Sequence, residues 1–204
     1  MSLDRKINRI QFLSGNSLKV IAVLTMLIDH LCKIVLQWLL SNYWGAMADN
    51  GQMSWERFRE IDYFIRFDLQ SIGTIAFPLF CFLLAEGFQH TRSKKRYIGL
   101  MLAFALISEV PFDIGFFNAY SRMEGTFPFY LKYQNVFFTL FLGLLTLVCL
   151  ERFSCKSDLP VDRIKSAVLQ VLSVVLFSGI AEGIHCDYGM QGILFISAFY
   201  ICRN

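Results

Sequence analysis

Long runs of apolar residues alternate with short polar segments along the whole chain. Six such runs occupy about residues 18–40, 71–88, 97–117, 135–153, 164–184 and 188–202. A helix that crosses the hydrocarbon core of a bilayer needs about 20 apolar residues, within a range of about 17–25. Most of the runs reach that length, so the pattern predicts an all-α polytopic integral membrane bundle of about six transmembrane helices.

We expect residues 1–204 to form a single transmembrane domain. The sixth run is short and stops where the sequence stops, which is consistent with a longer natural chain. The composition excludes an ordinary soluble domain, because 55% of the residues are hydrophobic and 17% are charged, whereas soluble domains carry about 25% charged residues. A lipid bilayer is therefore the expected surroundings. The net charge of +3 is too small to indicate a nucleic-acid partner.

Lysine and arginine residues concentrate in alternate connecting segments. The basic segments are the N-terminus, residues 90–96, residues 152–165 and Arg203, whereas the other connections have less net positive charge. The connection at residues 41–70 has three arginines against five acidic residues. Because cytoplasmic loops carry the excess of Lys and Arg, we predict that both termini are cytoplasmic. Residues 41–70 are then an extracytoplasmic loop, part of it an amphipathic surface helix within an aromatic belt.

The first apolar run carries ionisable residues at membrane depth, namely Asp29, His30 and Lys33. An Asp, Lys or Arg at the centre of a spanning helix costs about 2.5–3.5 kcal/mol on insertion scales. Lys19 and His30 are eleven residues apart, which is about three helical turns and ~16 Å, so both should lie on one face. His30 is a candidate general base. The alternative interpretations are an i, i+4 ion pair of Asp29 with Lys33 and an interhelical hydrogen bond of His30.

The second run ends in a mixed acidic and basic cluster. Glu86 and His90 share a helical face at i, i+4. The basic segment that follows contains Arg92, Lys94, Lys95 and Arg96. This segment is either a topology signal alone or a cytoplasmic cation cluster for a cofactor with phosphate groups, such as coenzyme A.

Polar residues also mark the ends of the third and fourth runs. Glu109, Pro111 and Asp113 close the third run, and Pro111 is expected to break or kink the helix and free backbone carbonyl groups. The two acids should then lie near the outer face. Asn135 begins the fourth run and is a candidate to stabilise an oxyanion.

The connection between the fifth and sixth runs contains Glu182, His185, Asp187 and Tyr188. Their spacing matches no metal-binding motif, so no metal site is predicted. Asp187 and Tyr188 are instead candidates to bind an acceptor. The six cysteines form no C-x-x-C motif, and we interpret them as small apolar residues in packing positions.

Several strings in this order resemble the TraX family of conjugal-transfer membrane proteins, from about residue 18 to 195. They are MLIDH (26–30), IAFPLF (75–80), AEGFQHTR (85–92), ISEVPFD (107–113), NVFFT (135–139) and DYG (187–189) with Gly192. The resemblance implies a multi-pass acetyltransferase of the bacterial cytoplasmic (inner) membrane, with acetyl-CoA as donor and the N-terminus of the conjugative pilin as acceptor. A fainter similarity is to the broader membrane acyltransferases, which carry an Arg before a His on the first helix. Here Lys19 takes that place and lacks the bidentate guanidinium.

These observations together predict acyl transfer from acetyl-CoA to an amine or hydroxyl group. The candidate phosphate contacts are Lys19, Arg92, Lys94, Lys95 and Arg96. His30, oriented by Asp29, would accept the proton of the acceptor, with Glu86 and His90 as the rival acid–base pair. The acceptor-side candidates are Glu109, Asp113, Asp187 and Tyr188. Two other classes use the same features: a transporter or proton pathway, and a structural membrane component.

Overall fold

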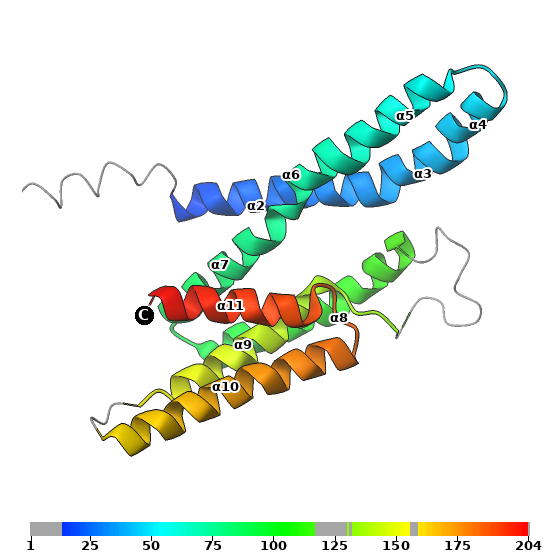
Figure 1. Cartoon of the computed structure of the whole chain (residues 1–204). Coiled ribbons are helices and arrows are strands. Elements are labelled where there is room, and N and C mark those ends of the chain that lie inside the picture. Colours follow the sequence, from blue (N-terminus) through cyan, green and yellow to red (C-terminus); the bar gives the residue numbers. More distant parts are fainter. Residues whose placement is uncertain (1–13, 117–129, 131, 156–158, 204) are drawn as a thin grey trace, which may run out of the picture. The chain divides into compact units, whose positions relative to one another are not determined.

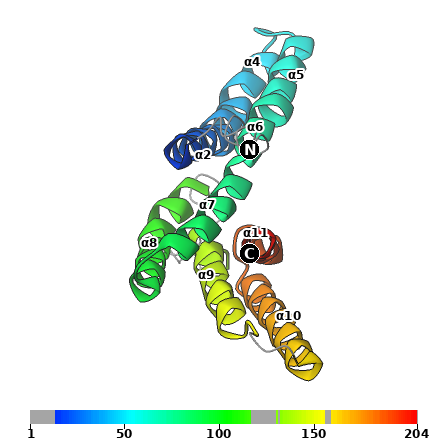
Figure 2. The same cartoon turned by 90° about the vertical axis from the view of Figure 1, so that its left-hand side faces the viewer.

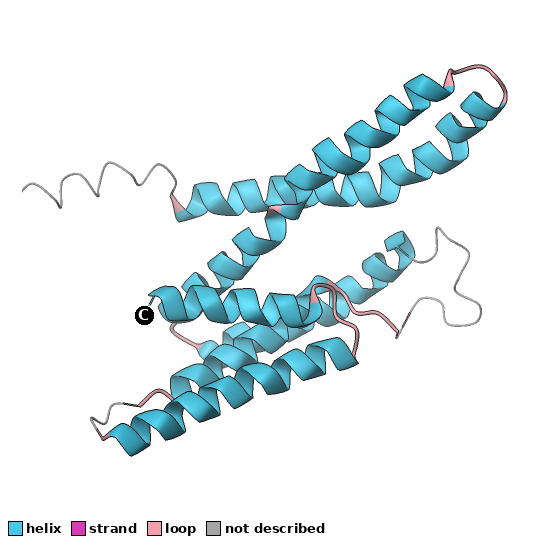
Figure 3. Ribbon diagram, viewed as in Figure 1, coloured by secondary structure: helices cyan, strands magenta, loops and turns pink. Residues whose placement is uncertain are grey.

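The computed structural model describes residues 14–116, 130, 132–155 and 159–203. Figure 3 shows that these ranges are helical apart from short connections, with one isolated bridge between Gln134 and Cys186. The all-α prediction is therefore confirmed for the described residues. The chain divides into two compact units, residues 1–83 and 84–204. The prediction of a single transmembrane domain stays a prediction.

The first unit contains two long helical rods joined by a short turn (Figure 1). The first rod consists of α2 (Gly15–His30), the π-helix η1 (Leu31–Leu36), α3 (Gln37–Leu39), the π-helix η2 (Leu40–Trp44) and α4 (Gly45–Asp49). The second consists of α5 (Trp55–Tyr63), the π-helix η3 (Phe64–Leu69), α6 (Gln70–Thr74) and α7 (Ala76–His90), whose last residues belong to the second unit. The rods pack through α2 against α6 and through η1 against η3.

Residues 41–70, predicted as an extracytoplasmic loop with an amphipathic surface helix in part of it, are almost entirely helical. Only residues 50–54 connect the rods, with Gly51 in a left-handed conformation (φ 71°). Ser54 caps α5, because its hydroxyl accepts a hydrogen bond from the Arg57 N–H at 3.2 Å. The polar sequence of α5 hides this helix from a search for apolar runs, although helix formation requires only backbone hydrogen bonds. The extracytoplasmic position of this segment stays a prediction.

The second unit is organised around α9 (Val136–Arg152). This helix packs against α8 (Lys94–Phe116), α10 (Pro160–Gly183) and α11 (Gly189–Arg203), and α10 also packs against α11 (Figures 1 and 2). A helix that is apolar all round is normally buried, and α9 fits this rule. Its buried residues are Thr139, Leu140, Leu142, Gly143, Leu144, Thr146, Leu147 and Leu150.

Four helical segments of the described chain are long and apolar enough to cross a membrane. They are Gly15–Asp49, Trp55–His90, Lys94–Phe116 and Pro160–Gly183. The most apolar stretches of the first, third and fourth are only 17% buried inside the protein, as expected of side chains that face lipid. Two further helices, α9 with 17 residues and α11 with 15, are shorter.

Helix α8 continues through Pro111 to Phe116. Of the two effects expected of Pro111, the break is therefore wrong, whereas the kink stays a prediction. Proline removes one backbone donor, and the neighbouring turns maintain the helix past that point. As a consequence Glu109 and Asp113 lie one turn apart on a continuous helix, and both are buried.

Candidate functional site

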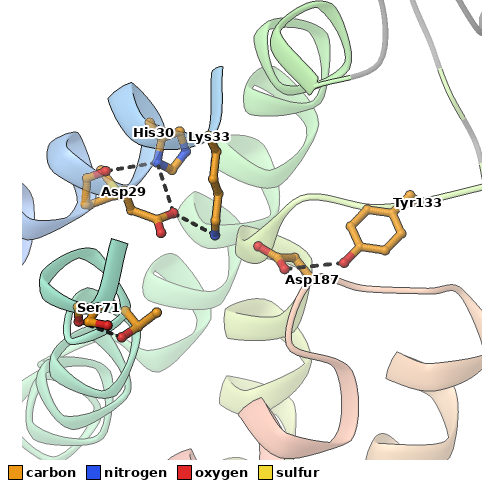
Figure 4. Close-up of polar contacts among 8 residues, drawn as sticks. Asp29, His30, Lys33, Ser71, Tyr133 and Asp187 are labelled. Atoms are coloured by element: carbon orange, nitrogen blue, oxygen red, sulfur yellow. Dashed lines mark hydrogen bonds and ion pairs between the residues drawn. The ribbon is translucent and has the colours of Figure 1, made fainter. Parts of the chain in front are cut away.

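Asp29, His30 and Lys33 form a charged cluster in the first unit, at the junction of α2 and η1 (Figure 4). The Asp29 Oδ2 atom lies 2.9 Å from the Lys33 Nζ atom, so the i, i+4 ion pair predicted from the sequence is present. Asp29 is buried, whereas the side chain of His30 is 42% exposed. The ion pair lowers the cost of keeping both charges in an apolar helix.

The ring of His30 is oriented by the backbone. Its Nδ1 atom lies 3.0 Å from the carbonyl oxygen of Met26 (Figure 4). Because a carbonyl oxygen only accepts, Nδ1 carries the hydrogen, and the lone pair of the neutral ring is on Nε2. Asp29 Oδ2 is 3.8 Å from Nδ1, too far for a hydrogen bond. The Met26 carbonyl therefore holds the ring and Asp29 lies within ion-pair distance of it, and the prediction that Asp29 orients His30 stays a prediction.

Gly73 of α6 lies directly against the backbone of Asp29. A Cβ atom at this glycine would come within 2.7 Å of both Cα and Cβ of Asp29. No side chain other than hydrogen fits in that space, so Gly73 allows the two helices to approach at the charged cluster. Two residues earlier, the Ser71 hydroxyl donates to the backbone carbonyl of Phe67 in the preceding η3 segment (Figure 4). Sequence reasoning missed Gly73, because nothing local distinguishes it from other helical glycines.

A second charged cluster in the second unit joins the ends of α7 and α11. The His90 Nε2 atom lies 3.0 Å from Glu86 Oε1, which agrees with the predicted i, i+4 relation. Arg203 forms an ion pair with Glu86 and lies 3.2 Å from His90 Nε2. Glu86 is therefore part of an ion-pair network that holds α11 to α7, a structural role beside the predicted catalytic one. Arg203 was missed as a partner because it is 117 positions away in the sequence.

The basic segment after α7 divides into two groups. Lys94 forms an ion pair with Glu151 of α9 and lies 4.5 Å from the centroid of the Phe88 ring. Its charge is thus already neutralised within the fold. Arg92, Lys95 and Arg96 are exposed, and they are the members of the predicted phosphate-binding set that this segment presents outward. Lys19 is also exposed, on α2 of the first unit.

Asn135 is a buried helix cap. Its side-chain oxygen accepts from the Phe137 N–H at 2.9 Å, and its amide nitrogen donates to the Ala105 carbonyl at 2.8 Å and to Glu109 Oε2. The backbone N–H of Asn135 also donates to Glu109 Oε2, at 3.2 Å. Both amide hydrogens are therefore in use. This geometry argues against the predicted role of Asn135 as an oxyanion donor and makes it the link between α8 and α9.

The turn between α10 and α11 is fixed by contacts to α9 and the residues before it. Thr139 donates its hydroxyl hydrogen to the carbonyl of Asp187. The Tyr133 hydroxyl lies 3.4 Å from Asp187 Oδ1 (Figure 4). Tyr188 has φ 63° and His185 φ 53°, a region that non-glycine residues rarely adopt. Asp187 and Tyr188 are thus held in one conformation at this end of the second unit.

Glu182 also contributes to this turn. Its Oε1 atom accepts a hydrogen bond from the N–H of Met190 at 2.8 Å, which is the start of α11. Among the described residues no three His, Cys, Asp or Glu side chains are grouped as a metal ion would require. Glu182 here satisfies a helix N-terminus.

Burial and nearby acids change the acidity of two side chains beside this turn. Burial is the main reason why the pKa of the Cys186 thiol is raised to about 11, and the negative charges of Glu109, Asp187 and Glu182 add to it. Burial likewise raises the pKa of the Tyr133 hydroxyl, with Asp187 as the next cause. The local field at this end of the second unit is therefore negative.

Comparison with known proteins adds an independent observation. The family model described as "TraX protein" matches residues 14–204. The chain is also 29% identical over 186 residues to "Probable fimbrial assembly protein FimC, serogroup H1" of Dichelobacter nodosus. That match covers 89% of this chain but 59% of the relative, so the chain spans less than two thirds of that protein. No solved structure matches the chain significantly. The match over residues 14–204 places the chain in the TraX family.

Proposed function

We propose that this protein is a membrane-embedded acetyltransferase that transfers an acetyl group from acetyl-CoA to a primary amine, with a pilin N-terminus as the acceptor implied by the TraX resemblance. The amine nitrogen attacks the thioester carbonyl, the C–S bond breaks and an amide forms. The amine loses a proton to a base of the protein, and the thiolate leaves and takes up a proton as free coenzyme A. The bacterial inner membrane is the proposed location.

The observation that carries the proposal is the charged cluster in a membrane-spanning helix of a TraX protein. A general base must be reachable and must hold a lone pair near neutral pH. His30 meets the first condition, because its side chain is 42% exposed, and its ring is held by the contact of Nδ1 with the Met26 carbonyl. The Asp29–Lys33 ion pair in the next turn supplies a fixed, nearly neutral environment.

The donor has a separate set of candidate contacts. Coenzyme A carries several phosphate groups, and arginine binds phosphate through two parallel hydrogen bonds. Arg92, Lys95 and Arg96 are exposed on the segment that follows α7. We assign these three residues to the phosphates, and we remove Lys94 from the set because Glu151 already pairs with it.

We also propose that α9 and α11 cross the membrane, which gives six spans with both termini cytoplasmic. Seventeen residues reach the lower limit for a span, and α11 is buried against α9 and α10 along one side. Single cysteines placed at Gln52 and at Ser93 in a cysteine-free background test this topology. A membrane-impermeant maleimide should label Gln52→Cys from outside and Ser93→Cys only after the cells are opened. The reverse pattern would contradict the topology.

The three histidines of the chain provide the test of catalysis. Purified protein in detergent is given radiolabelled acetyl-CoA and a peptide with a free N-terminus, and acetylated peptide is counted. His30→Gln should lose transfer by about 100-fold or more while still binding acetyl-CoA. His90→Gln tests the alternative acid–base pair, Glu86 and His90. His185→Asn, in the turn between α10 and α11, is the control. Full activity in His30→Gln would refute the assigned base, and no binding of acetyl-CoA by folded wild type would refute the enzyme.

A proton or cation pathway is the second candidate function. It is favoured by one observation, the burial of Glu109 and Asp113 in a membrane-spanning helix, because intramembrane acids are typical of such pathways. Acidification of sealed vesicles that contain the protein, in the absence of any acyl donor, would support this function. If vesicles that contain the protein take up no protons, this second function is refuted.

A further inference from the structure

Glu109 and Asp113 form a pair of buried carboxyl groups on one face of α8. They are one helical turn apart, which places their Cβ atoms about 5–6 Å from each other. Glu109 is 6% exposed and Asp113 is fully buried. Among the described residues no Lys, Arg or His forms an ion pair with either of them. Two like charges at this depth are costly unless a cation accompanies them.

Each carboxyl group has one oxygen held by the protein. Asp113 Oδ2 accepts from the N–H of Tyr130 at 2.6 Å, and Glu109 Oε2 accepts from the backbone N–H and side-chain amide of Asn135. The donors fix the orientation of both groups, since each comes from a segment outside α8.

Among the residues that the structure describes, the other oxygen of each group has no hydrogen-bond partner. Glu109 Oε1 and Asp113 Oδ1 are buried and accept no hydrogen bond. Buried acceptors are rarely left unsatisfied in proteins, because each costs about 1–3 kcal/mol. Two such oxygens on consecutive turns are therefore an independent sign that a donor is missing, beyond the presence of two acids.

We infer that Glu109 and Asp113 bind a primary ammonium group, and that this group is the acceptor amine before transfer. The inference rests on the proposed acetyltransferase function. An ammonium carries three N–H donors and one positive charge, so it satisfies both orphan oxygens and neutralises the pair. The bound ammonium first loses one proton to a base of the protein, and acetylation of the resulting amine gives a neutral amide, which no longer carries the charge that held it. The same pair therefore favours the unmodified acceptor and releases the product.

The surrounding charges agree with a cationic ligand. Glu182 and Asp187 lie in or beside the adjoining turn, and together with Glu109 they contribute to the raised pKa of Cys186, after burial. A divalent metal fits less well, because Ca²⁺ takes six to eight oxygen ligands and Mg²⁺ demands an octahedral set. The described residues do not supply a third acidic or imidazole group there.

Thermal unfolding in detergent tests the inference without acetyl-CoA. The probe is n-butylammonium chloride, compared with N-butylacetamide and with sodium chloride at equal concentrations. A ligand that binds the folded state raises the unfolding temperature with a saturable dependence on concentration. We expect such a rise for butylammonium only. An equal rise with sodium chloride would overturn the ammonium assignment in favour of an inorganic cation, and the absence of any saturable rise would overturn the site.

Isosteric variants identify the residues. Glu109→Gln and Asp113→Asn should each weaken butylammonium binding about tenfold or more, whereas Asp162→Asn, in the first turn of α10, should leave it unchanged. Without ligand, each pair variant should unfold at or above the wild-type temperature, because it removes one of two like charges. Binding that persists in the double variant would overturn the inference.

The outcome is separable from that of the proposed function. Butylammonium binding without acetyl transfer under any condition would support the cation site and refute the proposed acetyltransferase function. Conversely, Glu109→Gln and Asp113→Asn could leave acetyl transfer to the peptide unchanged while no ammonium binding is detected. That result would refute the ammonium site and leave the proposed acetyltransferase function standing. Both readouts use the full chain.

Discussion

Replacement of Gly73 by alanine tests whether the approach of α6 to α2 positions the charged cluster. The added Cβ atom would lie 2.7 Å from Cα and Cβ of Asp29 and 3.0 Å from its backbone nitrogen. Non-bonded carbon atoms pack at about 3.5–4.0 Å. The two helices must therefore separate by about 1 Å at this point, since the obstacle is backbone and has no rotamer to escape into.

The magnitude follows from two opposing terms. Overpacking of a tight contact costs about 1–3 kcal/mol, while Gly→Ala inside a helix gains up to about 1 kcal/mol of helix propensity. Gly99→Ala in α8 and Gly179→Ala in α10 share the second term but not the first, because nothing lies within 4 Å of their added Cβ atoms. We expect Gly73→Ala to be less stable than either control by about 1–3 kcal/mol.

Activity should change more than stability. A displacement of about 1 Å at a catalytic group can cost about 100-fold in rate, and Asp29 is next to His30. Unfolding in detergent and acetyl transfer to a peptide are measured for all three alanine variants. A loss of stability with full transfer would restrict Gly73 to packing. If Gly73→Ala matches Gly99→Ala in both measurements, the reasoning from the close approach is wrong.

Three further predictions use other contacts. Lys33→Met removes the i, i+4 partner of the buried Asp29 carboxylate and should destabilise the protein by about 1–3 kcal/mol, a value reduced for the partial exposure of Lys33. The double variant that also carries Asp29→Asn should regain most of the lost stability in the same unfolding assay. Asn135→Ala should lower the stability by about 2 kcal/mol, because the helix cap is lost. Asn135→Asp keeps the cap acceptor but faces Glu109, so it should lower the stability more. Equal losses in the two variants would contradict the role of the Asn135 amide as donor to Glu109. In single-cysteine variants, Cys186 should resist iodoacetamide at pH 8 and react faster only as the pH rises toward its pKa of about 11. The exposed Cys202 is the control and should react at pH 8. Equal reaction rates of the two cysteines at pH 8 would refute the argument from burial.

Interactions within one or two helical turns could be predicted from the sequence. The Asp29–Lys33 and Glu86–His90 pairs follow from the i, i+4 spacing alone. The same is true of the start of α9 at Asn135, a residue type that favours the cap position. The family strings were equally readable, because they are contiguous. These features share one property, that the partners are close in the chain.

The polar helix α5 shows the limit of reading hydropathy. It belongs to no apolar run, yet Trp55–Tyr63 is helical, because a helix satisfies its own backbone hydrogen bonds whatever its side chains face. Pro111 is the opposite case. Proline disfavours helix locally, yet α8 continues through it, because the other residues of this 23-residue helix maintain the helical backbone on both sides.

The sequence by itself determined that this is an all-helical TraX-family chain with apolar helices of membrane-spanning length and ionisable residues within them. Only the tertiary structure decided which of those residues meet. Gly73 against Asp29, Arg203 with Glu86, Lys94 with Glu151 and Asn135 with Glu109 each join residues 26 or more positions apart. Such contacts depend on how whole helices pack, and packing is set by the summed shape of many side chains rather than by any local pattern.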